Sequence, residues 1–214
     1  MKITLTDGKV LELPQGTTVA GVASAISEGL RRNALAGKVN GKLVDLSYAL
    51  NDDAEVVIVT AKDPEALNIY RHTCAHVLAQ AVKSIYPTCS LAIGPTIDTG
   101  FYYDIDFKTP ITMDDLPKIE EEMKKIIKAD LAIERFELPR EDAAALMKKY
   151  KEPYKVQLIK DLPEDSVISF YKQGDFTDLC RGPHLPSTGL IKAFKLTSIA
   201  GAYWRGNEKN KMLT

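Results

Sequence analysis

The sequence predicts an α+β protein built from two domains. Short alternating runs joined by turn pairs fill the first sixty residues, one long amphipathic helix follows, and strand-like and helical runs share the rest. A chain of 214 residues is long enough for one or two domains with real cores, and 45% hydrophobic and 27% charged residues are typical of a soluble globular protein.

The first sixty residues have the element order of a small β-grasp sheet crossed by one helix. The run KITLT alternates, Asp7-Gly8 supplies a two-residue hairpin turn, and KVLEL alternates again. Apolar residues recur at helical spacing over 19–26, after a threonine suited to the N-cap. Asn40-Gly41 predicts a second hairpin, and 56–59 is a last apolar strand. The alternative that the pattern leaves open is another small α+β unit.

A helix from Pro64 to about Tyr86 is the clearest element of the chain. Proline suits the first helical position, and Pro87 ends the helix. At about 100° per residue, His72 and His76 point away from the main apolar stripe, so they are not simply fillers of that face. The stripe consists of Leu67, Tyr70, Cys74, Leu78, Ala81 and Ile85.

The rest of the chain is expected to contain strands, two shorter helices and one long loop. Apolar residues at helical spacing predict helices over 112–128 and 140–150. Strands are expected in LAIGPTIDTGFYYDIDF, LAIERFEL, SVISFY, FTDLC and IKAFKLTSIAGAYWRG, and a loop in CRGPHLPSTG. The chain stops at GNEKNKMLT without a closing signal, which suggests a fragment of a longer protein.

Charge and composition limit the kinds of partner that the protein can have. The 28 basic and 29 acidic residues give a net charge of -1, whereas a protein that held nucleic acid by charge alone would be more basic. Contact with nucleic acid would therefore need a local patch. Because no apolar run approaches the ~20 residues of a membrane span and the N-terminus lacks a signal-peptide core, we expect a cytoplasmic protein without a membrane partner. Three cysteines do not suggest a disulfide framework.

Two short segments of the sequence contain all three histidines. His72 and His76 stand one helical turn apart, and Cys180 precedes His184 by four residues in the glycine- and proline-containing loop. Two imidazoles on one helix face can reach a common ligand. The four side chains could form a tetrahedral zinc site or a metal-free hydrolytic cluster with histidine as general base. Each phrase alone fits an exposed or structural role, but together they favour one functional site.

Five ordered stretches carry a resemblance to a known family. RHTCAHVLAQAV, AIGPTIDTGFYYDID, EPYKVQLI, GDFTDLCRGPHLPSTG and AFKLTSIAGAYWRG resemble the N-terminal region of the bacterial threonyl-tRNA synthetases. The resemblance implies a TGS-type β-grasp domain over 1–61 and an editing domain over 62–214, of the second-additional-domain type shared with alanyl-tRNA editing proteins. It also implies that the aminoacylation domain, with its ATP and zinc sites, and the anticodon-binding domain are absent.

The function implied by the resemblance is editing of mischarged tRNA. Threonine and serine share a hydroxyl and differ by one methyl group, which is worth about 1–3 kcal/mol and cannot exclude serine well enough. A second site that admits serine and rejects the extra methyl would hydrolyse the ester of serine on the 3' end of tRNA(Thr), using a placed water, a base and oxyanion stabilisation.

The resemblance also assigns residues to this site. His72 matches a position proposed to act on the attacking water or the ribose hydroxyl, and Lys155 one proposed to position water or stabilise the oxyanion. Asp178 suits the α-ammonium of the substrate. The remaining members complete the pocket wall or meet the terminal adenosine: His76, Cys180, His184, Tyr103 and Phe101.

Several alternatives stay open at this stage. A site without metal is preferred for editing, but a zinc-dependent deacylase with His72, His76, Cys180 and His184 as ligands is the close competitor. A non-catalytic tRNA-binding module is a third interpretation. A monomeric fragment is expected, because the family's dimers form largely through the absent catalytic domain.

Overall fold

The computed structural model describes residues 1–214, and the chain packs as two compact units. One unit comprises Met1–Tyr70 with Gly182–Pro186, and the other comprises Arg71–Arg181 with Ser187–Thr214. The expected domain boundary after residue 61 stays a prediction, because these units are defined by packing.

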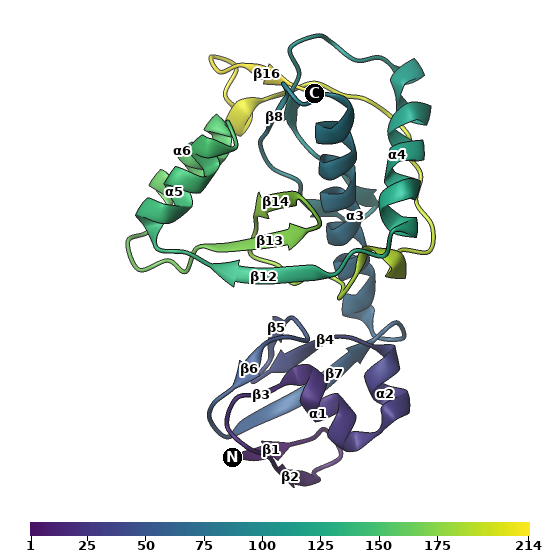
Figure 1. Ribbon diagram of the computed structural model, residues 1–214, viewed down its shortest axis with the longest axis vertical. Coiled ribbons are helices and arrows are strands. Elements are labelled where there is room, and N and C mark those ends of the chain that lie inside the picture. The colour runs from purple at the N-terminus through teal and green to yellow at the C-terminus, as the bar shows by residue number, and fades with distance from the viewer. The chain divides into compact units, whose positions relative to one another are not determined.

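A five-stranded sheet in the order β2-β1-β7-β4-β5 forms the centre of the first unit (Figure 1). β1 (Lys2–Thr4) pairs antiparallel with β2 (Val10–Glu12) and parallel with β7 (Ala54–Thr60). β4 (Ala34–Val39) then joins β7 to β5 (Lys42–Val44), antiparallel on both sides. Both hairpin turns lie where the sequence predicts them. The first contains three residues, 6–8, between the paired Leu5 and Lys9, instead of the two that we expected, and the second is the two-residue turn Asn40-Gly41.

One helix covers this sheet. α1 (Val19–Ile26) begins at Thr18, whose Oγ1 accepts a hydrogen bond from the N–H of Gly21 at 3.1 Å. Its buried face packs against β4 so closely that a Cβ on Gly37 would lie 2.5 Å from Cγ1 of Val19. The predicted β-grasp order of hairpin, helix and further strands is confirmed. The unit also contains α2 (Glu28–Asn33), which we did not predict, and the short pair β3 (Thr17–Thr18) and β6 (Ala49–Leu50).

A three-stranded antiparallel sheet forms the centre of the second unit, in the order β12-β13-β14. The strands are β12 (Ile133–Glu137), β13 (Ser169–Gln173) and β14 (Phe176–Leu179). Two helices, α5 (Arg140–Lys149) and α6 (Pro153–Asp161), lie side by side (Figure 1) and share an apolar cluster with this sheet.

The long helix α3 (Pro64–Ile85) lies next to this sheet. Nε2 of Gln173 on β13 donates a hydrogen bond to Oε1 of Gln80 on the helix at 2.7 Å. Beside it lie α4 (Leu116–Lys128) and three small antiparallel ladders. The ladders join β8 (Ser90–Leu91) to β11 (Ile105–Asp106), β9 (Thr96–Ile97) to β10 (Gly100–Phe101) and β15 (Ala202–Tyr203) to β16 (Met212–Leu213). Short 3-10 turns occupy Met113–Asp115, Thr188–Leu190 and Trp204–Gly206.

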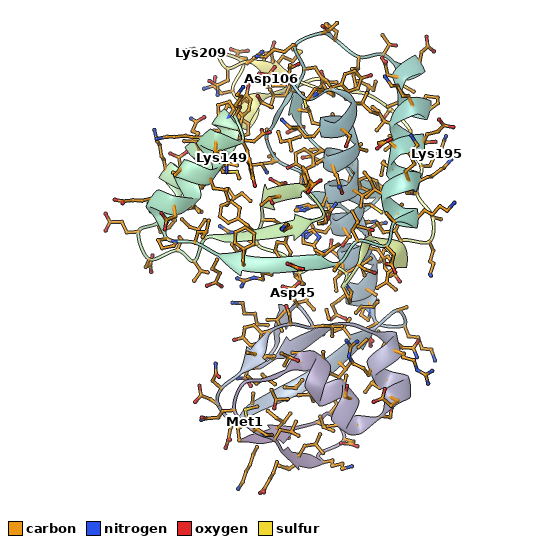
Figure 2. The ribbon with its side chains drawn as sticks, viewed as in Figure 1. Met1, Asp45, Asp106, Lys149, Lys195 and Lys209 are labelled. Carbon is orange, nitrogen blue, oxygen red and sulfur yellow. The ribbon has the colours of Figure 1, made fainter.

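Two structural expectations were wrong, and one helix of the second unit was missed. Residues 191–201 form an irregular extended segment instead of a strand. The carboxylate of Glu120 on α4 binds the backbone N–H of Leu196 and the ammonium of Lys195 (the latter residue is labelled in Figure 2) in place of a strand partner. Leu67 is 55% exposed, since α3 buries Ala66 and Ile69 instead. The missed element is α6, which has only nine residues. No helix of the chain is both long and apolar enough to cross a bilayer.

Candidate active site

Helix α3 and the end of β14 bring three of the predicted residues together. His72 and His76 lie one turn apart on α3, with ring centroids 5.5 Å apart and nearly perpendicular rings. Cys180 follows the last residue of β14, and its Sγ lies 3.2 Å from Nε2 of His72. Ligand atoms of these three side chains all lie within 4.8 Å of one another. The two distant phrases of the sequence therefore do meet through His72, His76 and Cys180.

His184 belongs to the short segment Gly182–Pro186, which packs with the first unit. Its backbone N–H donates to Oδ1 of Asp45 (labelled in Figure 2) at 3.0 Å, and its side chain is buried. The four-residue spacing from Cys180 keeps the two Cα atoms within about 14 Å of each other. Its place in the cluster stays a prediction.

A second group of side chains is buried in the same unit. Lys155 lies in the first turn of α6, and its Nζ pairs with Oδ1 of Asp178 at 2.7 Å and donates to the hydroxyl of Tyr103 at 2.8 Å. That hydroxyl donates to Oδ2 of Asp178 at 2.5 Å. All three side chains are at most 6% exposed. Three elements that are remote in sequence therefore converge on one carboxylate.

The two groups adjoin each other through His76. Its Nε2 lies 3.7 Å from Oδ2 of Asp178, and its ring meets Tyr171 and Phe176 edge-on. Burial lowers the pKa of His76 to about 3, although the carboxylate of Asp178 opposes this shift. His76 is therefore neutral at pH 7, and its approach to Asp178 is a polar contact between a neutral ring and a carboxylate.

The pKa values of Asp178 and Tyr103 move in opposite directions. Burial by itself would raise the pKa of Asp178, but the charge of Lys155 and the hydrogen bonds from Lys155 and Tyr103 outweigh it, so the pKa falls below its usual range. Burial and the neighbouring carboxylate raise the pKa of Tyr103 well above its usual value. The site therefore holds an ammonium, a carboxylate, and a phenol that keeps its proton.

Acid should weaken the fold through His76. An unfolded histidine takes up a proton near pH 6.5, whereas folded His76 resists protonation until about pH 3. The unfolded state binds more protons in this window, so stability present above pH 6.5 is lost as the pH falls. With a chelator present, we expect the free energy of unfolding to drop by about 1 kcal/mol per pH unit below pH 6.5. Urea unfolding at pH 7 and pH 5 measures this pH dependence of the free energy of unfolding. The His76→Gln variant should lose less stability between the two pH values. An equal loss in both proteins would contradict the prediction.

Phe101 is not part of the charged group. It lies on β10 and lines a cavity of about 580 Å³ together with Tyr103, residues of α3 and α4, and the segment 195–200. The lining of this cavity includes none of the histidines, Lys155 or Asp178. Tyr103 therefore belongs both to the charged group with Lys155 and Asp178 and to the lining of the cavity, whereas Phe101 only lines the cavity.

Sequence reasoning missed the role of Gly94. A Cβ at this position would overlap the ring of Tyr103, so only glycine lets the backbone approach the ring this closely. We expect Gly94→Ala to push Tyr103 away from Asp178, to lower the free energy of unfolding by about 1–3 kcal/mol and to reduce activity at this site. Gly100→Ala is the matched control, since a Cβ there meets nothing within 4 Å, and thermal unfolding together with an activity assay would compare the two. Equal behaviour of both variants would show that the contact is unimportant.

An ion pair with a buried carboxylate, beside the site, was also missed. Glu152, the residue before α6, accepts a hydrogen bond from the N–H of Leu91 at 2.6 Å and pairs with Nζ of Lys83 at 2.7 Å. Burial raises the pKa of Glu152, and Lys83 opposes that shift. This pair ties the start of α6 to α3 and β8, and no local pattern in the sequence signals it.

Comparison with known proteins accounts for both units. Residues 1–60 match the TGS domain family, and residues 168–214 match the family of the threonyl and alanyl tRNA synthetase second additional domain. Threonine–tRNA ligases of Acetivibrio thermocellus and Desulforamulus reducens are each 61% identical over 213 residues, a coverage of about 100% of this chain. The chain is homologous to the N-terminal region of bacterial threonine–tRNA ligases. It spans about a third of these relatives, 34% in both cases.

Two residues of the candidate site lie in the domain that the family model matches. The matched second additional domain contains β13, β14 and the hairpin β15–β16, and with them Asp178 and Cys180. A threonine–tRNA ligase of Clostridioides difficile is 57% identical over the same length. The expected similarity to the N-terminal region of threonyl-tRNA synthetases and the presence of the two domain types are thereby confirmed, while the domain bounds and the roles of the single residues stay predictions.

Proposed function

We propose that this chain hydrolyses the ester of serine mistakenly attached to tRNA(Thr), as the editing part of a threonine–tRNA ligase. The observation that supports this most strongly is the buried network of Lys155, Asp178 and Tyr103 next to the His72–Cys180 contact. The relatives that carry the same two domains are named threonine–tRNA ligases.

Hydrolysis of this ester needs a water, a proton acceptor and a group that stabilises negative charge. Water adds to the ester carbonyl, the carbon–oxygen bond to the ribose breaks, and serine and a free tRNA 3' end are released. His72 is half-buried and is held by Cys180, so its imidazole suits the transfer of a proton from the water or to the ribose oxygen. The ammonium of Lys155 would stabilise the oxyanion.

Asp178 is suited to the α-ammonium of the aminoacyl group. A carboxylate offers about four acceptor positions. Lys155 and Tyr103 use two of them, so a third charged donor can bind without displacing either. Tyr103 fixes the carboxylate, and His76, Cys180 and His184 form the wall of the pocket. Phe101 would contact the terminal adenosine from the neighbouring cavity.

Side-by-side deacylation of seryl-tRNA(Thr) and threonyl-tRNA(Thr) tests this function. We expect serine to be released about 10–200-fold faster than threonine, because one methyl group separates them, and His72→Ala to be slow on both. Equal release of both amino acids would contradict a size-selective pocket. Release at the uncatalysed rate by the chain and the variant would leave only tRNA binding, the alternative that the net charge of -1 makes weak.

A zinc-dependent deacylase is the second candidate, because the donor set fits zinc. Tetrahedral zinc holds a thiolate sulfur and an imidazole nitrogen about 3.6 Å apart. The observed 3.2 Å between Cys180 and His72 is close to this value, and His76 is neutral, which is the form in which an imidazole binds a metal. Zinc held by these three residues and His184 would lower the pKa of a bound water.

Metal analysis of the purified chain should decide between the two candidates. We expect less than one zinc per ten chains and an unchanged deacylation rate after treatment with a chelator. Stoichiometric zinc, together with activity that the chelator removes and added zinc restores, would favour the second candidate. Cys180→Ser is the matched variant, because it would lower zinc content only if the thiol is a ligand.

The partner proposed for this function is the acceptor 3' end of tRNA(Thr) carrying serine. We place the protein in the cytoplasm, where tRNA is charged, and we expect the 214-residue chain to be monomeric, whereas the longer relatives would dimerise.

A further inference from the structure

Helix α6 has two faces with different partners. One face carries Lys155 into the buried network with Asp178 and Tyr103. The other face presents Tyr154, Gln157, Leu158 and Asp161, which recur at helical spacing. Any displacement of this second face therefore moves the ammonium of Lys155 relative to Asp178.

The hairpin β15–β16 holds the second face through Trp204. The indole is 6% exposed, its centroid lies 5.0 Å from that of the Tyr154 ring, and its Nε1–H donates to Oε1 of Gln157 at 3.1 Å. Leu158 packs against the same cluster. Arg205 lies over the indole and pairs with Asp161 at the end of α6. Three positions of the helix, Tyr154, Gln157 and Asp161, are thus held by two neighbouring residues of the hairpin.

The hairpin is itself fixed to the strand that follows Tyr103. Ile105 and Thr214 exchange backbone hydrogen bonds at 2.8 and 2.9 Å. Asp106 (labelled in Figure 2) accepts a hydrogen bond from the hydroxyl of Tyr154 at 2.9 Å, and its other oxygen forms an ion pair with Lys211 at 2.6 Å. The hairpin therefore contacts Tyr154, the residue before Lys155, and also Ile105 and Asp106, which follow Tyr103 by two and three positions.

We propose that Trp204 is a positioning residue for the hydrolytic reaction, which acts by holding α6 so that Lys155 stays on Asp178 and Tyr103. The inference rests on the proposed editing function. It follows from the geometry, because Trp204 touches α6 at residues that point to a different side from Lys155, and a shift of about 1 Å in a reacting group can slow a reaction about 100-fold.

Deacylation kinetics of a double-mutant cycle test the proposal. We expect Trp204→Ala to lower kcat for seryl-tRNA(Thr) about 10–100-fold with KM within about twofold, and to cause no further loss when Lys155 is already alanine. Trp204→Phe and Gln157→Met, which remove the indole–amide hydrogen bond, should lower kcat less than Trp204→Ala does. Gln157→Glu should keep the unchanged rate, because its carboxylate still accepts the hydrogen bond from the indole. The matched control is Tyr203→Ala in the same hairpin, since Tyr203 is 42% exposed. An equal loss from Trp204→Ala with and without Lys155 would overturn the proposal.

Side-chain reactivity gives a second measurement that does not depend on the reaction. An amine-acetylating reagent should modify Lys155 slowly in the original chain and at least about fivefold faster in Trp204→Ala, as read by peptide mass. Iodoacetamide labelling of Cys74, which is 4% exposed on α3, reports general opening of the unit and should stay unchanged. If both reactivities rise together, Trp204 only stabilises the fold and the proposal is wrong. If Lys155 alone is released but no deacylation occurs in the original chain, positioning stands and the editing function fails.

Discussion

Replacing Lys155 by alanine is expected to lower the rate of seryl-tRNA(Thr) deacylation about 100-fold or more. The ammonium is the only cation in direct contact with Asp178, at 2.7 Å, and preorganised charge of this kind is worth about 10²–10³ in rate when it faces a developing oxyanion. Single-turnover hydrolysis of the mischarged tRNA measures the effect directly.

The same substitution should weaken the fold. Both partners of the Lys155–Asp178 pair are about 4% exposed or less, and removing one partner of a buried pair costs about 3–5 kcal/mol because the other charge is left uncompensated. Urea unfolding should show this loss, and deacylation must be measured where circular dichroism shows the variant folded. Lys160→Ala, at an exposed lysine of the same helix, is the matched control and should change neither quantity. A folded Lys155→Ala protein with the original rate would remove Lys155 from the reaction.

Asp178→Asn should lower deacylation by a similar factor, for a different reason. Asparagine has nearly the same shape and can still accept the hydrogen bond from Tyr103, but it carries no charge to pair with the α-ammonium of the substrate or with Lys155. We therefore expect a higher KM together with a lower kcat.

The role of Asp178 can be isolated by changing the substrate. N-acetylated seryl-tRNA(Thr) has no α-ammonium, so the original chain should hydrolyse it more slowly than seryl-tRNA(Thr), whereas Asp178→Asn should treat both alike. Asp175→Asn, at an exposed aspartate three residues before Asp178 on the same hairpin, should behave like the original chain. A variant that still distinguishes the two substrates would show that the ammonium binds elsewhere.

Local sequence patterns predicted the fold well where a few neighbouring residues determine it. The Asp7-Gly8 and Asn40-Gly41 pairs form their hairpins because glycine adopts the positive φ that such turns require, 82° and 80° here. The helix from Pro64 is long and periodic enough to be unambiguous. Helix α6 was not predicted, because nine residues are too few to show a clear helical periodicity. Residues 191–201 were wrongly predicted as a strand, because the side chain of Glu120 on α4 binds them.

The candidate site was only partly predictable from residue chemistry. The histidine pair and Cys180 attracted attention because these residue types are scarce and suit one kind of chemistry, and they do lie together. Lys155, Tyr103 and Asp178 have ordinary residue types at separations of 23 to 75 positions, so only the resemblance to a known family marked them. Gly94 and Trp204 act through contacts across the fold that no local pattern encodes.

The burial of the Asp178 carboxylate has a consequence for how the reaction depends on ionic strength. Mobile ions screen exposed charges within about 10 Å at 0.1 M salt, but they hardly reach a pair as enclosed as Lys155 and Asp178. Added potassium chloride should therefore loosen attachment of the tRNA phosphates while leaving the rate of bond cleavage in the bound complex nearly constant.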